Sequence, residues 1–192
     1  MASDTDETNR RDFLMIAASA FGAVGGAAAL WPFIDQMNPD ASTLSLSTTE
    51  VDISKVEEGQ AIQVVWRGKQ IFIRHRTAAE IAEARAVKLA DLPDQKSRND
   101  SIKDAALDTA ADIHRTLPGK EKWLVMVGVC THLGCIPKGN KLGDEKGEYK
   151  GWFCPCHGSH YDTSGRIRKG PAPENLAVPP YQFVKDTVIK IG

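Results

Sequence analysis

The stretches that decide the fold are Cys130-Thr131-His132-Leu133-Gly134-Cys135 and Cys154-Pro155-Cys156-His157-Gly158-Ser159-His160-Tyr161. They contain all four cysteines of the 192-residue chain, and such clustering points to a local site rather than to disulfides spread over a fold. Each box offers one Cys and one His at ligand spacing, C-x-H in the first and C-x-x-H in the second. Two thiolates and two imidazoles suit either zinc or an iron–sulfur cluster.

The spacing within the boxes favours the iron–sulfur alternative. Structural zinc sites usually draw on C-x-x-C or H-x-x-H pairs, and neither box has its two cysteines at that spacing. Two loops that each deliver one Cys and one His are typical of the Rieske centre, in which two imidazoles replace two thiolates on one iron of a 2Fe-2S cluster. A zinc-binding module stays open as an alternative, and an EPR spectrum of the reduced protein would decide between them.

The overall composition excludes a nucleic-acid binder and leaves room for one main domain. Lys and Arg number 24 and Asp and Glu number 25, so the formal net charge is -1 and there is no basic excess. A hydrophobic content of 42% with 7% aromatic residues allows one modest core. The length therefore suggests a single domain with an appendage.

The N-terminal part of the chain predicts an export signal joined to a membrane anchor. Arg10-Arg11 directly before an apolar run resembles a twin-arginine signal, although two positive-inside arginines flanking a helix would look the same. From Phe13 to Ile34 there is no charged residue, and a helix of that length, at about 1.5 Å per residue, spans roughly 33 Å. Ala27-Ala28-Ala29 could serve as a cleavage site, but the apolar run continues past it, so we predict an uncleaved anchor.

The predicted organisation has four parts. These are a cytoplasmic N-terminus over 1–12, a transmembrane helix over 13–36, a linker over 37–46 and a head over 47–192, whose cluster-binding subdomain covers about 123–178. Pro39 is expected to stop the helix, because proline disfavours αR at the preceding residue and cannot donate a backbone hydrogen bond. The small polar residues that follow indicate a linker, which is either a passive tether or a hinge.

The head is predicted to be mainly β, an antiparallel β-sandwich with one inserted segment. Residues 62–66 and 70–74 flank a Gly-containing turn and predict a hairpin, and Thr77 and Glu80 form a capping box before a short helix. The other predicted features are a polar surface insertion over 93–122 with one short helix near 104–113, a buried strand over 123–129, and two closing strands within 181–191. His75 and His114 are expected at the surface, and His160 is expected to be structural or solvent-facing.

Taken together, the chain resembles the bacterial form of the Rieske iron–sulfur family of the ubiquinol–cytochrome c reductase (cytochrome bc) complex. The motifs C-T-H-L-G-C and C-P-C-H-G-S-H-Y carry the likeness. Further matches extend it over nearly the whole chain: Met37-Asn38-Pro39, Ile73-Arg74-His75-Arg76-Thr77 and Gly170-Pro171-Ala172-Pro173. One departure is the stretch between the boxes, which includes Lys141 and Glu145 and is longer and more charged than the family pattern.

The resemblance implies a ligand set. Cys130 and Cys154 would bind one iron, His132 and His157 would bind the other, and Cys135 and Cys156 would form a disulfide between the two loops. An exported head domain permits such a disulfide. The outward nitrogens of the two histidines would titrate, which couples electron uptake to proton uptake.

The resemblance also implies roles for residues around the ligands. Ser159 and Tyr161 match the family's hydroxyl donors to a bridging sulfide and to a cysteine sulfur, and such hydrogen bonds raise the reduction potential by stabilising the reduced form. Leu133 and the Gly170–Pro173 loop would shield the cluster and shape a docking face.

The function that the resemblance implies is electron transfer in a quinol-oxidising complex. The chain would take one electron and a proton from ubiquinol, with His157 receiving the proton, and would pass the electron to a c-type cytochrome. The implied partners are a cytochrome b subunit, a c-type cytochrome, ubiquinol and membrane lipids, in a dimeric complex of the bacterial inner membrane with the head in the periplasm.

Two rivals stay open at the level of sequence. A small Rieske subunit of another exported oxidoreductase, such as arsenite oxidase, would share the export signal and both boxes, and co-purification with a b-type cytochrome would distinguish it. A soluble Rieske ferredoxin is disfavoured by the anchor and by the extra pair Cys135 and Cys156.

Overall fold

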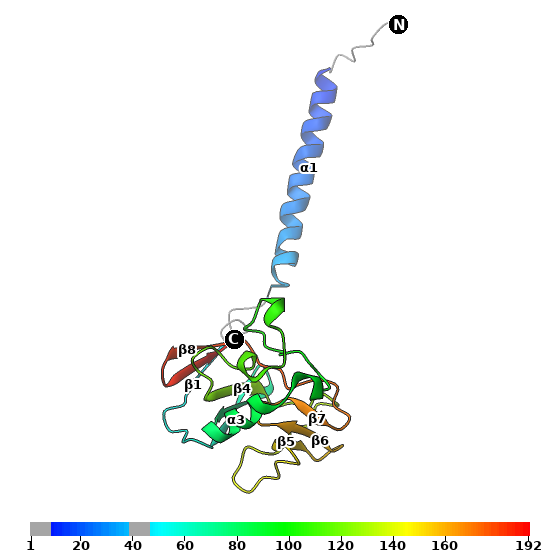
Figure 1. Cartoon of the computed structure of the whole chain (residues 1–192). Coiled ribbons are helices and arrows are strands. Elements are labelled where there is room, and N and C mark those ends of the chain that lie inside the picture. Colours follow the sequence, from blue (N-terminus) through cyan, green and yellow to red (C-terminus); the bar gives the residue numbers. More distant parts are fainter. Residues whose placement is uncertain (1–8, 39–46) are drawn as a thin grey trace. The chain divides into compact units, whose positions relative to one another are not determined.

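The computed structural model of the chain describes residues 9–38 and 47–192 (Figure 1). It divides into two compact units, Met1–Leu44 and Ser45–Gly192. Of the predicted parts, residues 1–8 of the N-terminus and residues 39–46 of the linker lie outside the described residues.

The first unit contains one long helix, α1, over Arg10–Asp35. It begins three residues before the predicted 13, because Asn9 caps it: the Asn9 side chain accepts from Arg11 N at 2.7 Å, and Asn9 N donates to Asp12 at 3.1 Å. The helix ends at Asp35, before Pro39 is reached. It is long and apolar enough to span a membrane, and none of its described residues is buried within the structure.

The head is built from three antiparallel sheets of three strands each. Their orders are β1-β9-β8, β2-β3-β4 and β5-β6-β7. The strands are β1 (Thr49–Asp52), β2 (Ala61–Trp66), β3 (Lys69–His75), β4 (Trp123–Val127), β5 (Lys150–Cys154), β6 (Ser159–Asp162), β7 (Ile167–Lys169), β8 (Tyr181–Lys185) and β9 (Val188–Ile191). The predicted mainly β head and its two closing strands are thus confirmed.

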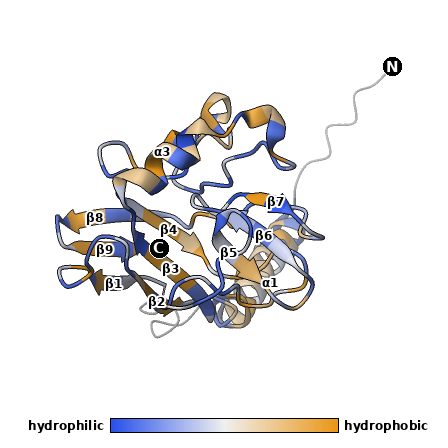
Figure 2. Ribbon diagram, turned by 60° about the horizontal axis from the view of Figure 1, so that its bottom comes forward, coloured by the Kyte–Doolittle hydropathy of each residue, from blue (hydrophilic) through white to orange (hydrophobic). Residues whose placement is uncertain are grey.

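The β2-β3-β4 sheet is the middle layer of the head (Figure 2). An apolar cluster lies on each of its faces. Because successive strand residues point to opposite faces, Ile71 and Ile73 pack toward the β1-β9-β8 sheet, whereas Phe72 packs toward the β5-β6-β7 sheet. Burial on both faces explains why residues 123–127 form an uninterrupted apolar run.

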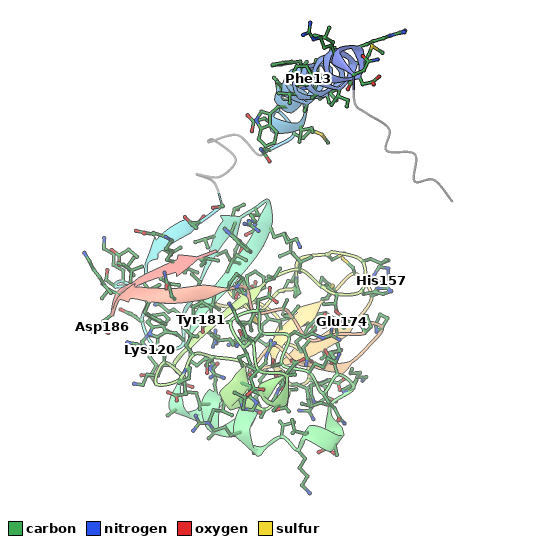
Figure 3. The ribbon with its side chains drawn as sticks, turned by 90° about the horizontal axis from the view of Figure 1, so that it is seen from above. Phe13, Lys120, His157, Glu174, Tyr181 and Asp186 are labelled. Atoms are coloured by element: carbon green, nitrogen blue, oxygen red, sulfur yellow. The ribbon has the colours of Figure 1, made fainter. Side chains whose placement is uncertain are left out.

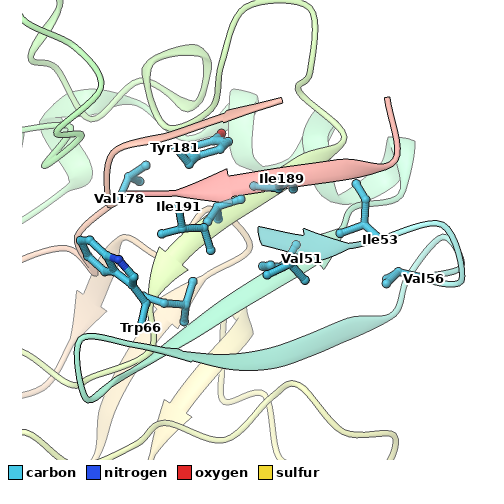
Figure 4. Close-up of a cluster of buried hydrophobic side chains, with 11 residues drawn as sticks. Val51, Ile53, Val56, Trp66, Val178, Tyr181, Ile189 and Ile191 are labelled. Atoms are coloured by element: carbon cyan, nitrogen blue, oxygen red, sulfur yellow. The ribbon is translucent and has the colours of Figure 1, made fainter. Parts of the chain in front are cut away.

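The two apolar clusters are called the sandwich core and the site core. The sandwich core lies between the β1-β9-β8 and β2-β3-β4 sheets (Figure 4) and consists of Val51, Ile53, Val56, Trp66, Ile71, Ile73, Val125, Val178, Tyr181, Ile189 and Ile191. The site core lies on the other face and consists of Phe72, Leu124, Met126, Cys130, Trp152, Cys154, Tyr161, Ile167, Ala172 and Leu176.

Local sequence signals placed the first hairpin and the short helix correctly. The β2–β3 hairpin closes through Arg67 and Gly68, which both have positive φ (48° and 72°), as a tight two-residue hairpin turn requires. The helix α3 (Ala78–Ala86) begins at the predicted capping box, with Glu80 N donating to Thr77 Oγ1 at 3.2 Å.

The prediction of a surface insertion with one helix near 104–113 was wrong. The segment contains two 3-10 turns, η2 (Ala105–Leu107) and η3 (Asp112–His114), and a third, η1 (Leu89–Asp91), precedes it. Several of its polar residues are buried: Asp94, Ser97, Asn99, Asp112, Arg115 and Thr116. Arg115 donates to Ser164 O at 3.0 Å and to Leu176 O at 2.6 Å, so the segment is packed into the head.

His75 and His114, expected at the surface, are only partly exposed. His75 stacks on Trp123, with ring centroids 4.2 Å apart, and its Nδ1 lies 2.9 Å from Val56 O. His114 Nδ1 lies 2.7 Å from Thr109 Oγ1. Each imidazole therefore has a structural partner.

Candidate metal centre

The first box is the loop that leaves the buried end of β4. Gly128 makes this exit possible, because a Cβ there would lie 2.3 Å from the Phe72 ring. The loop is closed by Cys130 N donating to Cys135 O at 2.7 Å and Gly134 N donating to Cys130 O at 2.9 Å. Gly134 adopts φ 82°, which favours glycine.

The second box is the hairpin loop between β5 and β6. Cys154 and Ser159 face each other in the strand register, and Gly158 N donates to Cys154 O at 3.0 Å. The hairpin thus places Cys154 at its base and His157 near its tip. Across β5, Phe153 and Lys138 exchange backbone hydrogen bonds of 2.7 and 2.9 Å, which ties the strand to the chain that follows the first box.

A third loop, Gly170–Pro173, closes against both boxes. A Cβ on Gly170 would lie 2.5 Å from Gly158 O, so glycine is required for the approach to the second box. Ala172 N donates to Ser159 Oγ at 3.2 Å. Just beyond the loop, Glu174 O accepts from Thr131 Oγ1 at 2.7 Å. Sequence reasoning missed Thr131 and Glu174, because nothing local marks a contact between positions 43 apart.

The predicted ligands lie at this meeting of loops. Cys130 and Cys154 are buried in the site core, while His132 is half-buried and His157 is exposed (Figure 3 labels His157). The rings of His132 and His157 meet edge to face with centroids 4.6 Å apart. Two sulfurs at the base and two imidazoles toward solvent are an arrangement that can hold a cluster.

Two observations test whether these residues fit a cationic group. Within the described ranges, His132 Nδ1 is buried without a hydrogen-bond partner, which is costly for a polar atom unless something else ligates it. Burial raises the pKa of the Cys154 thiol to about 12, so it becomes a thiolate at neutral pH only when a metal displaces its proton. Both atoms thus fit the Rieske group.

Ser159 and Tyr161 are the predicted donors to sulfur, and the structure places the Tyr161 hydroxyl beside a cysteine sulfur. The Tyr161 hydroxyl lies 3.2 Å from Cys130 Sγ and 3.4 Å from Thr131 N, and Tyr161 is fully buried. Burial raises the pKa of the Tyr161 phenol. The phenol therefore stays protonated and can donate a hydrogen bond to a thiolate. Ser159 Oγ accepts from Ala172 N, which leaves its own hydrogen free to donate.

The remaining cysteines sit beside the ligands. The Sγ atoms of Cys135, Cys154 and Cys156 lie within 4.8 Å of one another. This group of three thiols differs from the predicted ligand set, which combines Cys130 and Cys154 with two histidines. All four cysteines are free thiols in the structure, and the predicted disulfide between Cys135 and Cys156 is not formed there. Cys130, the predicted ligand, is buried, whereas Cys156 is exposed.

Two further predicted positions are clear. Leu133 projects from the first box with 70% of its surface exposed. His160 is structural, because its Nδ1 accepts from Glu148 N at 3.2 Å and its ring packs on Phe153 at 4.7 Å. These contacts confirm the structural position expected for His160.

Comparison with known families finds two matches. Residues 48–181 match the family described as the Rieske 2Fe-2S domain. Residues 1–40 match the family described as the ubiquitinol-cytochrome C reductase Fe-S subunit TAT signal. Together they cover most of the chain, and the Rieske match excludes the zinc alternative at the level of family.

Comparison with individual proteins gives the same result. The iron–sulfur subunit of ubiquinol-cytochrome c reductase from Rhodospirillum rubrum is 58% identical over 97% of this chain and 93% of its own length. The corresponding subunit from Bradyrhizobium diazoefficiens is 57% identical over 100% of this chain and 98% of its own length. A chain of the solved hyperthermophilic respiratory Complex III is 27% identical, with a TM-score of 0.50, and the match covers 91% of this chain and 98% of that one.

Proposed function

This chain belongs to the Rieske family as an iron–sulfur subunit of ubiquinol–cytochrome c reductase, and from that premise we propose that it takes one electron and one proton from ubiquinol and passes the electron to a c-type cytochrome. Family membership itself makes the chain an electron-transfer component of the cytochrome bc complex and gives it a 2Fe-2S cofactor. The quinol and cytochrome steps are the proposal. The observation that carries it is the edge-to-face pair of His132 and His157 at the exposed side of two buried cysteines.

We assign the ligands as two sulfurs and two imidazoles. Cys130 and Cys154 would hold one iron, and His132 and His157 would hold the other. When bound, the Rieske group supplies a one-electron acceptor whose potential, at roughly -150 to +300 mV, lies well above that of all-cysteine plant-type centres. Tyr161 and Ser159 would donate hydrogen bonds to sulfur and favour the reduced state.

His157 is the residue proposed to meet the quinol. Its exposure lets its ring accept a hydrogen bond from a quinol hydroxyl and hold the released proton at its outward nitrogen. Leu133, which is exposed in the first box, would offer an apolar contact for the docking face. The Gly170–Pro173 loop, packed on the second box, would keep water away from the sulfurs.

The proposed surroundings follow from the anchor and the family. Helix α1 would cross the bacterial inner membrane once, with the residues before it in the cytoplasm and the head in the periplasm. Residues 37–46 would act as the hinge on which the head moves between cytochrome b and the c-type cytochrome of a dimeric complex. In the oxidising periplasm, Cys135 and Cys156, whose sulfurs lie within 4.8 Å, would form a disulfide that ties the two boxes together.

A potentiometric titration across pH tests the coupled step. If the outward imidazole nitrogens carry the proton, the midpoint potential of the membrane-extracted complex should be constant at low pH and fall at high pH. The limiting slope should be about 59 mV per pH unit for each proton taken up with the electron. A potential that does not change between pH 6 and pH 10 would contradict proton-coupled electron uptake.

A further inference from the structure

One hydroxyl joins the first box to the residue that follows the third loop. Thr131 stands between the assigned ligands Cys130 and His132. Its Oγ1 donates to Glu174 O at 2.7 Å and accepts from Glu174 N at 3.3 Å. The position of the first box is therefore tied to the position of the Glu174 backbone.

The Glu174 side chain is held from the other side by Arg98. The guanidinium Nη1 lies 3.1 Å from Glu174 Oε1, while Nε donates to Asp94 Oδ2 at 3.0 Å. Asp94 is buried, and Arg98 and Glu174 have 31% and 45% of their side chains exposed. One planar guanidinium thus bridges two carboxylates with two different nitrogens, which a lysine could not reproduce.

Asp94 is itself tied to the same stretch of chain. Its Oδ2 accepts from Asn175 N at 2.9 Å, and its main-chain carbonyl accepts from Asn175 Nδ2 at 3.0 Å. Asn175 Nδ2 also donates to Lys96 O at 2.8 Å. Residues 94–98 therefore lie along residues 174–178, although the two segments are 81 positions apart at Asp94 and Asn175.

The backbone of Arg98 is strained in a way that keeps this arrangement. Its φ of 50° lies in the left-handed region that non-glycine residues rarely adopt. The conformation is fixed by Val178 N donating to Arg98 O at 2.7 Å and by Asp100 N donating to Val178 O at 3.0 Å. Such strain persists only where the surrounding contacts determine the conformation, and it is common near functional sites.

We propose that Asp94 and Arg98 are positioning residues for the metal centre, which act through Glu174 and Thr131. We call Asp94, Arg98 and Glu174 the clasp. The clasp fixes the position of Glu174 at the end of the third loop, and the Thr131 hydroxyl connects Glu174 to the first box. Loss of the clasp would therefore loosen both loops and admit water to the sulfurs. The clasp gives the inserted segment, residues 93–122, a role at the site, and this role rests on the proposed ligand set.

The test compares Arg98→Gln with a matched ion-pair variant, Lys120→Gln. Lys120 Nζ pairs with Asp186 at 2.8 Å, at the end of the head opposite to His157 and Glu174 (Figure 3). Peptide hydrogen exchange over 129–135 and 170–177 is measured on the membrane-extracted complex. Arg98→Gln should accelerate exchange in both peptides by about fivefold or more, and Lys120→Gln should leave them unchanged. Arg98→Lys should fall between them.

A second readout on the same samples follows the cofactor. Bleaching of the visible circular dichroism under an iron chelator should be several-fold faster in Arg98→Gln than in the wild type and in Lys120→Gln. If Arg98→Gln does not fold, Glu174→Gln, which removes only a half-exposed carboxylate, takes its place. Equal hydrogen-exchange rates in Arg98→Gln, or in its substitute Glu174→Gln, and in the wild type would overturn the proposed role of the clasp.

The exchange comparison does not depend on the identity of the metal. If the proposed function fails, the wild type itself will lack iron and a reduced-state EPR signal, whatever the exchange rates are. If only the clasp proposal fails, the wild type will contain iron and give the EPR signal. The variants will then show the same hydrogen-exchange and bleaching rates as the wild type.

Discussion

The two faces of the β2-β3-β4 sheet are held by different interactions. The sandwich core on one face consists of apolar side chains and one tyrosine, and it is closed by antiparallel pairing of β1 and β8 with β9. The site core on the other face contains Cys130, Cys154 and Tyr161, and its loops are held by polar contacts between distant segments. We infer that one face supplies stability and that the other holds the proposed ligands, and each prediction below perturbs one face alone.

The largest effect is expected from removing a sulfur of the site core. Cys154→Ser should abolish the 2Fe-2S cluster, because a buried hydroxyl is a poor ligand for iron at this position. The measurement is iron content with reduced-state EPR on the purified complex. Far-UV circular dichroism of the head is the control, since the sandwich core is untouched. Full iron retention by the variant would contradict the ligand assignment.

The next effect comes from the opposite face. Ile73→Ala leaves a cavity in the sandwich core, where Ile73 is fully buried, and should lower the free energy of unfolding by about 3 kcal/mol. Urea unfolding measures the loss, and Val65→Ala, at an exposed position of β2, is the control with little change. The EPR g values should stay those of the wild type, and altered g values would show that the two faces are not separable.

A smaller effect is expected at the hydrogen bond to sulfur. Tyr161→Phe removes the hydroxyl 3.2 Å from Cys130 Sγ and should lower the midpoint potential on the order of 60 mV, the equivalent of one hydrogen bond to a charged group. Redox titration measures the shift. Tyr181→Phe in the sandwich core is the control, because its hydroxyl accepts from Leu117 N, away from the site. A Tyr161→Phe potential equal to that of the wild type would refute the tuning role.

The smallest effect is the acid dependence of the clasp. Burial opposes ionisation of Asp94, but hydrogen bonds from Asn175 N, Arg98 and Lys96 N outweigh it and hold the pKa of Asp94 below its ordinary value. The carboxylate therefore stabilises the head above about pH 4, and this contribution is lost as the pH falls through the lowered pKa. The difference in unfolding free energy between the wild type and Asp94→Asn should shrink from pH 7 to pH 3. A constant difference would show that the charge of Asp94 contributes nothing.

Sequence reasoning succeeded where the signal was local. The β2–β3 hairpin and the capping box of α3 each lie within a few consecutive residues, and both formed where they were expected. The start of α1 was missed although Asn9 and Asp12 carry a capping signal of the same kind.

The failures share a physical cause. Arg115 is fully buried, and burial lowers the pKa of its guanidinium to about 10, yet in the sequence it reads as a surface charge. Its partners are backbone carbonyl groups, one 18 positions away at Ser97 and others 49 and 61 positions away at Ser164 and Leu176. No apolar period marks such a segment, so its packing could not be anticipated and the clasp could not be found from the sequence.

The central claim is that two buried sulfurs and two outward imidazoles hold a binuclear iron centre. The most direct measurement is reduced-state EPR together with iron and zinc analysis of the membrane-extracted wild-type complex. We predict a Rieske-type signal with two iron atoms per chain and no stoichiometric zinc. A chain that retained one zinc and no iron, and gave no EPR signal on reduction, would contradict the account.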